Sequence, residues 1–130
     1  MSTDTTASVS THILDTSTGR PAASVTVALA ARGDGDAQYV ALGGSATDAD
    51  GRCKDLPALP EGTTHVRLVF DTESYFSSQK QAEVQQDAPR ARDSGAFFPE
   101  VAVAFAVTPG EHYHVPLLLN PFGYSVYRGS

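Results

Sequence analysis

The stretch Val101-Ala102-Val103-Ala104-Phe105-Ala106-Val107 alternates without a break between large apolar residues and alanine. A pattern with period two is typical of a β-strand that turns one face toward a core. The valines and the phenylalanine are expected to face that core. The small alanines leave the second face open to close approach by another layer.

Segments that precede this strand repeat its pattern: Ser24–Ala30, Tyr39–Leu42 and Val66–Phe70. In the first of them the side chains of Val25, Val27 and Leu29 share one face, and a further β pattern begins at Thr11. Glycine, proline and aspartate mark turns between these segments: Gly19–Pro21, Gly33–Asp36 and Thr47–Arg52. Many short strands separated by turns predict an all-β domain, either a sandwich or a barrel.

One segment has the composition of a helix. Glu73–Glu83 is expected to form a short helix, with Asp71 or Thr72 as its N-cap. The polar segment 85–95 is expected to be an exposed surface loop. Residues 1–10 are small and polar and are expected to be a flexible N-terminal segment, so the folded domain is predicted to comprise residues 11–130.

The composition argues against several classes of function. The net charge is −6 and the basic residues are scattered, which argues against binding to nucleic acid. No stretch approaches the roughly 18 uninterrupted apolar residues of a membrane span, and the first residues do not form a secretory signal. The single Cys53 fits a reducing compartment, so a cytoplasmic protein without a membrane partner is expected.

The histidines are the first candidates for chemistry. His112 and His114 are two residues apart, so they share a face of a strand, and His12 could join them as a third metal ligand. No carboxylate lies at a persuasive spacing for a metal, and a neutral imidazole acting as a general base on water is the stronger interpretation. Other candidates have plain structural alternatives: a strand start for His65, a solvated turn for Arg52, and completion of a strand face for Tyr127.

Four stretches of the chain carry a family resemblance: Ser10–Ala22, Thr47–Arg52, Phe97–Val101, and the run from His112 to Leu119 with the ending Tyr127-Arg128-Gly129-Ser130. In this order they resemble the motifs of the 5-hydroxyisourate hydrolases, the transthyretin-related enzymes of urate breakdown. The resemblance extends from about Ser10 to Ser130. The C-terminal motif is its most specific part.

The resemblance implies a transthyretin-like two-sheet β-sandwich with one short helix. It also implies a homotetramer, built as a dimer of dimers, with active sites in a channel where the dimers meet. The substrate would be 5-hydroxyisourate, and water would open its ring to give 2-oxo-4-hydroxy-4-carboxy-5-ureidoimidazoline. Nothing changes oxidation state in this reaction, so no cofactor is expected.

The resemblance also assigns residues to roles. It implies three catalytic residues: His12, Arg52 and His114. Substrate binding falls on the terminal tetrapeptide: Tyr127, Arg128, Gly129 and Ser130. No metal is expected. Either catalytic histidine could take the proton from water, the arginine would orient the substrate and stabilise an oxyanion, and Arg128 could anchor the terminus through a charged pair.

The chain departs from the family pattern in three places. Asn120 stands where serine is usual, Phe122 stands where tyrosine is common, and the segment 77–96 is longer than usual and is expected to be a surface insertion. Two other functions compete with the hydrolase: a transthyretin-type carrier of a small aromatic ligand, and a structural sandwich domain. A carrier is expected to have apolar or non-ionisable residues at positions 12, 52 and 114, and this chain has two histidines and an arginine there.

Overall fold

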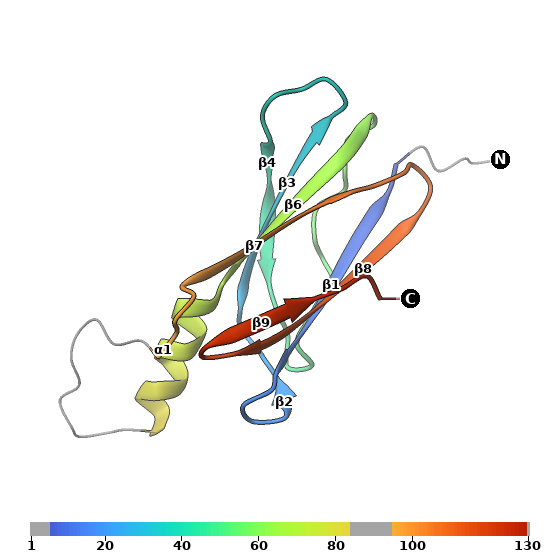
Figure 1. Cartoon of the computed structure of the whole chain (residues 1–130). Coiled ribbons are helices and arrows are strands. Elements are labelled where there is room, and N and C mark those ends of the chain that lie inside the picture. Colours follow the sequence, from blue (N-terminus) through green and yellow to red (C-terminus); the bar gives the residue numbers. More distant parts are fainter. Residues whose placement is uncertain (1–5, 84–94, 130) are drawn as a thin grey trace.

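The chain folds into two β-sheets that face each other, with one short helix at one end of the described residues (Figure 1). A computed structural model describes residues 6–83 and 95–129. The strands are β1 (Ser8–Asp15), β2 (Arg20–Pro21), β3 (Thr26–Gly33), β4 (Val40–Ala46), β5 (Arg52–Cys53), β6 (Thr63–Asp71), β7 (Glu100–Ala106), β8 (His112–Asn120) and β9 (Gly123–Val126). The helix α1 spans Thr72–Glu83. The predicted all-β sandwich with one short helix is confirmed.

The two sheets differ in how their strands pair. One sheet has the order β4-β3-β6-β7 and is antiparallel throughout. The other has the order β2-β1-β8-β9, with β5 paired to β1, and its central pair β1 and β8 is parallel. The first and the eighth strands of the chain therefore lie side by side in the middle of one sheet.

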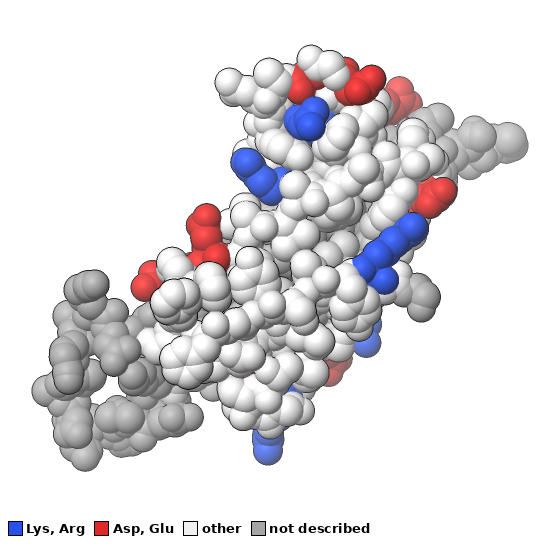
Figure 2. Space-filling model, viewed as in Figure 1, with Lys and Arg blue, Asp and Glu red and all other residues white. Residues whose placement is uncertain are grey.

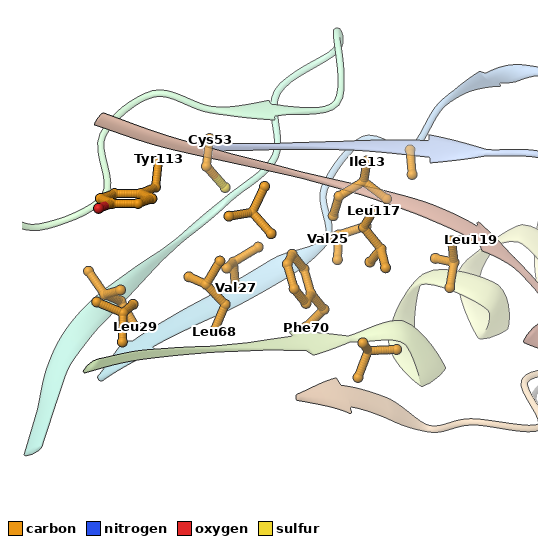
Figure 3. Packing of buried hydrophobic residues seen from close by; sticks show 14 of the residues in the cluster. Ile13, Val25, Val27, Leu29, Cys53, Leu68, Phe70, Tyr113, Leu117 and Leu119 are labelled. Atoms are coloured by element: carbon orange, nitrogen blue, oxygen red, sulfur yellow. The ribbon is translucent and has the colours of Figure 1, made fainter. Parts of the chain in front are cut away.

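The core lies between the sheets, and both contribute alternate side chains to it (Figure 3). Val25, Val27 and Leu29 are buried, as the period-two pattern predicts. Along β7 the exposure alternates in the same way, with the alanines on the open face. Complete burial of one such apolar side chain contributes about 1.5–3 kcal/mol, so these alternating faces hold the sandwich together.

The helix is fixed to the sandwich at its first turn. The Asp71 carboxylate accepts hydrogen bonds from the amide and the hydroxyl of Ser74, so Asp71 is the N-cap and Thr72 is already helical. One turn further, the Tyr75 hydroxyl donates a 2.7 Å hydrogen bond to the buried carboxylate of Asp15 on β1. The surface loop predicted for residues 85–95 falls almost wholly outside the described residues.

Several strands extend beyond their predicted bounds: β3 continues to Gly33, β6 spans Thr63–Asp71, and β1 and β4 are longer for reasons that can be identified. β1 begins at Ser8, not at Thr11, because Ser8 to Ser10 pair with His112 to His114 of β8. Of the predicted flexible segment 1–10, residues 1–5 lie outside the described part of the chain. β4 continues past Leu42 through two glycines, which have low strand propensity and conceal the strand in the sequence.

Glycine is required in β4 for a steric reason. A Cβ atom on Gly44 would lie 2.5 Å from the carbonyl oxygen of Val27. The close approach of β3 and β4 therefore excludes any side chain at this position. Within residues 6–83 and 95–129, no helix is long and apolar enough to cross a membrane.

Candidate active site

Three predicted site residues lie on the outer face of the sheet that contains β1 and β8. Thr11 and Ile13 of β1 point into the core, so His12 between them points outward. His114 lies between the buried residues Tyr113 and Val115 of β8 and also points outward. His12 is directly opposite Arg52 in the antiparallel pairing of β1 with β5. The pairing therefore brings together side chains that are about 40 and 100 positions apart in the chain.

A tight turn places Arg52 at the edge of this cluster. The Asp48 carboxylate accepts hydrogen bonds from the amides of Asp50 and Arg52, at 2.9 and 3.0 Å. The hydrogen bond from the Arg52 amide is the main reason that the pKa of Asp48 is lowered. Cys53, the next residue, is buried, so the Arg52 side chain is directed away from the core.

Gly51 is necessary for this turn. Its φ of 77° lies in the left-handed region that favours glycine, and a Cβ atom there would lie 2.5 Å from the carbonyl oxygen of Ile13. The Gly51 carbonyl also accepts a 2.8 Å hydrogen bond from the Ile13 amide. The predicted turn Thr47–Arg52 is thus confirmed, and its contact with β1 sets the position of Arg52.

His114 has a perturbed environment. Partial burial lowers its pKa, and the positive charge of Arg52 and the neighbouring imidazoles of His12 and His112 lower it further. The imidazole is therefore neutral at neutral pH and has a lone pair that can accept a proton. The strand register agrees with these contributions, because His12 is opposite Arg52 on one side of β1 and opposite Pro116, two residues from His114, on the other.

Two serines of β1 connect the histidines of β8. The Ser8 hydroxyl lies 2.6 Å from Nδ1 of His112, and the Ser10 hydroxyl lies 2.9 Å from Nε2 of the same ring. Ser10 also lies 2.8 Å from Nδ1 of His114. The hydroxyls thus engage both nitrogens of His112 and leave Nε2 of His114 for other contacts.

The sequence interpretation did not identify Ser8 and Ser10 as site residues. Their two-residue spacing matches that of His112 and His114, which is the signal that the sequence contains. This signal becomes readable only when β1 and β8 are known to be parallel and in register.

Gly129 is the residue of the terminal tetrapeptide that lies against the histidine cluster. Its amide donates a 2.7 Å hydrogen bond to the carbonyl oxygen of His114. A Cβ atom on Gly129 would lie 2.9 Å from Cδ2 of His114 and 3.2 Å from Cγ of Pro116. The backbone of the C-terminal segment therefore packs directly on one edge of the His114 ring.

Tyr127 and Arg128 are placed differently. Both line a pocket of about 300 Å³ between the two sheets, together with apolar residues of β7, β8 and β9. The Arg128 guanidinium lies 4.3 Å from the centre of the Tyr113 ring and forms an ion pair with Glu111, with 3.4 Å between Nη2 and Oε1. The charged pair predicted for Arg128 is thus present, whereas Ser130 lies outside the described residues.

No group of three histidine, cysteine, aspartate or glutamate side chains suited to a metal ion occurs in the described parts of the chain. His65 belongs to β6 in the other sheet, where its Nδ1 lies 2.8 Å from the Thr64 hydroxyl, so its structural interpretation is confirmed. Both ring nitrogens of His112 are already engaged by serine hydroxyls.

The fold and the site together define a two-sheet β-sandwich with a histidine and arginine cluster on the outer face of one sheet. The chain belongs to the HIUase/Transthyretin family, whose model matches residues 9–129. It is 41% identical over 124 residues to the 5-hydroxyisourate hydrolase of Salmonella typhimurium, and this match covers 94% of the chain and 80% of that protein.

Solved structures agree with this assignment. The 5-hydroxyisourate hydrolase of Klebsiella pneumoniae matches with a TM-score of 0.64 and 32% identity, over 95% of this chain and 94% of that chain. Transthyretin from Sparus aurata matches with a TM-score of 0.74 and 28% identity, over 93% and 95% of the two chains. The likeness to both proteins confirms the fold. Because the hydrolase and the transthyretin share this fold, their functions can be distinguished only by the side chains of the site on the outer face.

Proposed function

We propose that this protein hydrolyses 5-hydroxyisourate in urate catabolism. The observation that carries the proposal is the convergence of His12, Arg52 and His114 on one face of the sheet. The relatives named 5-hydroxyisourate hydrolase support the choice of substrate. The buried Cys53 fits a reducing compartment, so the proposal includes the cytoplasm as the place of action.

The proposed reaction begins with a neutral imidazole. His12 or His114 takes a proton from water, the water oxygen bonds to a ring carbonyl carbon, and the ring C–N bond breaks as its nitrogen gains a proton. Arg52 offers planar paired donors that orient the substrate carbonyls and stabilise the oxyanion. An unprotonated His114 at neutral pH supports its role as a base, because its pKa is lowered by burial and by nearby positive charge.

The terminal tetrapeptide belongs to the same proposal as the substrate-binding segment. Gly129 supports it directly, because its backbone closes one edge of the His114 ring. For Tyr127, Arg128 and Ser130 the support is the resemblance of the C-terminal motif to that of the hydrolases. Tyr127 and Arg128 are exposed in the single chain and can contact a neighbouring copy.

The same proposal includes a homotetramer. β7 and β9 are edge strands of their sheets and leave unpaired backbone groups that another strand can use. On the face of the molecule that contains β7 and β9, charged side chains lie mainly at the margins (Figure 2). Large exposed apolar side chains add to this evidence: Phe97, Phe98, Phe122, Tyr124 and Tyr127. Light scattering at the assay concentration should report four chains, and a fully active monomer would contradict the shared channel.

The test of the activity uses freshly formed substrate. Urate oxidase generates 5-hydroxyisourate from urate, and the absorbance of the product is followed with and without this protein. Faster decay with the protein, in proportion to its concentration, supports the proposal. Decay at the uncatalysed rate would contradict it and would favour the carrier interpretation, since a transthyretin of this fold has been solved with thyroxine.

A further inference from the structure

The Ser10 hydroxyl lies between two imidazole rings. Its oxygen is 2.9 Å from Nε2 of His112 and 2.8 Å from Nδ1 of His114. Ser10 and His114 are direct partners in the parallel pairing of β1 with β8, which runs over eight residue pairs. The position of the hydroxyl is therefore fixed by the centre of the sheet and not by a loop.

We propose that Ser10 is a positioning residue for His114, holding its proton on Nδ1 so that the lone pair of Nε2 faces the reacting water. This inference rests on the proposed hydrolase function, in which His114 is a base. It deepens that function by assigning a protonation pattern to the site. Ser10 acts through the imidazole and makes no contact with substrate in this assignment.

The pattern follows from counting protons along the chain of hydrogen bonds. Nδ1 of His114 is engaged by Ser10, so only Nε2 can accept a proton from water. A neutral ring that has its lone pair on Nε2 must have its proton on Nδ1. This Nδ1–H group then donates to the Ser10 oxygen. The single proton of Ser10 is left to donate to Nε2 of His112, and Nδ1 of His112 then donates to Ser8.

The opposite direction of donation is incompatible with a base at Nε2. If Ser10 donated to Nδ1 of His114, the ring proton would reside on Nε2, and His114 could not take a proton there. His114 would then present a donor at Nε2, where a lone pair is needed, although His112 could still donate from its Nε2 to the Ser10 oxygen. The direction of these hydrogen bonds thus decides whether His114 acts as a base or as a donor.

The surroundings of His114 favour a neutral ring with a defined proton position. Three groups on three elements act on its charge: Arg52 on β5, His12 on β1 and His112 on β8. Gly129 packs against Cδ2, which restricts rotation of the ring. A ring that can neither turn nor gain charge easily depends on its single hydroxyl partner to select between its two neutral forms.

The first experiment measures proton position without reference to activity. Long-range ¹H–¹⁵N spectra of the full-length protein at neutral pH distinguish a protonated ring nitrogen from an unprotonated one. We expect Nδ1 of His114 to carry the proton in the parent and in Ser10→Thr, which keeps the hydroxyl. We expect a mixture of the two neutral forms in Ser10→Ala. The matched control is Ser78→Ala on an exposed turn of α1, which should leave the spectrum unchanged.

The second experiment measures catalysis by the same variants. Ser10→Ala should lose about tenfold in kcat with little change in KM, as expected for one hydrogen bond that acts through another residue. Ser10→Thr should restore most of the loss. An unchanged proton position together with unchanged kcat in Ser10→Ala would overturn the inference. A proton on Nε2 of His114 in the parent would overturn it as well.

The outcomes separate this inference from the proposed function. If the parent does not hydrolyse 5-hydroxyisourate, the function fails, whereas the spectra still report whether Ser10 selects the form of His114. If the parent is active and Ser10→Ala matches it in both experiments, only the inference fails. Circular dichroism and thermal melting of each variant establish that the fold is retained.

Discussion

The amide of Gly129 donates a 2.7 Å hydrogen bond to the carbonyl oxygen of His114. This contact joins the C-terminal segment to β8 as an isolated bridge beyond the end of β9. The ring of His114 is therefore bounded on one edge by a serine hydroxyl and on another by a residue that has no side chain. The terminal segment acts as part of the wall around this histidine.

Substitution of Gly129 by alanine should displace the His114 ring. The new Cβ atom would lie 2.9 Å from Cδ2 of His114, which is shorter than an ordinary contact, and it would also lie 3.2 Å from Cγ of Pro116. We expect a loss of about tenfold or more in kcat/KM, because small displacements of a catalytic group have large effects. Gly123→Ala is the matched control, since its nearest neighbour would be 4.0 Å away. Equal activities of the two variants would show that the close contact has no catalytic role.

His114→Ala should harm turnover far more than His112→Ala. Loss of a general base typically costs about 10²–10⁴ in rate. Without the His112 ring, the Ser10 hydroxyl can still accept from His114 and can donate to water instead, because His112 is exposed. Steady-state kinetics of both folded variants provide the comparison. Losses of the same size would refute the different roles assigned to the two histidines.

Arg52→Lys should keep the positive charge and lose most of the activity. A lysine ammonium cannot reproduce the planar paired donors of a guanidinium. The main-chain hydrogen bonds to Asp48 do not involve the side chain, so the turn should remain intact. Near-normal kcat and KM in this variant would show that charge alone suffices at position 52.

The activity of the enzyme should persist below the ordinary titration range of histidine. Burial and the positive charge of Arg52 lower the pKa of His114, so its base form survives to a lower pH than the usual value of about 6.5. The acid limb of a kcat/KM profile should therefore have its midpoint below 6.5. A midpoint above this value would contradict His114 as the base.

The same shift has a consequence for stability. Between the lowered pKa of His114 and about 6.5, the unfolded chain binds more protons at this residue than the folded chain does. The contribution of His114 to the free energy of unfolding should thus fall as the pH drops through this window. Urea unfolding of the parent and of His114→Ala at several pH values measures the difference.

Tyr75→Phe should destabilise the fold without direct damage to the site. The buried carboxylate of Asp15 would lose the 2.7 Å hydrogen bond from the Tyr75 hydroxyl, which typically costs about 1–3 kcal/mol. Tyr39→Phe is a suitable control, because it keeps the ring that contacts Arg67 at 4.6 Å. Equal free energies of unfolding in the two variants would contradict a stabilising role for the Asp15 contact.

The sequence predicted the core faces well because period two is a local property. Val25, Val27 and Leu29 required no knowledge of their partners to be placed inside. The end of β4 was missed because its two glycines have low strand propensity, and the need for Gly44 becomes clear only from its contact with β3. The histidines were candidates from their residue type and spacing, and the resemblance then selected His12, Arg52 and His114. The proximity of these three residues depends on pairings that local patterns do not encode.

Ser10 was missed for the same reason. Its importance depends on a residue 104 positions away, across a parallel pairing. A serine two residues before His12 carries no signal of function in the sequence. Its contact with His114 is seen only when β8 is placed next to β1. Residues that work by positioning others are therefore the hardest to find from sequence alone.

The parallel pairing of β1 with β8 also has a consequence for synthesis on the ribosome. The N-terminal strand emerges first, yet it lacks its central neighbour until about residue 120 has been made. Contacts between segments so far apart in the sequence form slowly. Until they form, the unpaired edges of β1 can associate with other nascent chains. A chain that lacks β8 therefore cannot assemble the histidine cluster. Catalytic competence should appear only after β8 has left the ribosome and paired with β1, which a translation-arrest assay with chains of increasing length can measure.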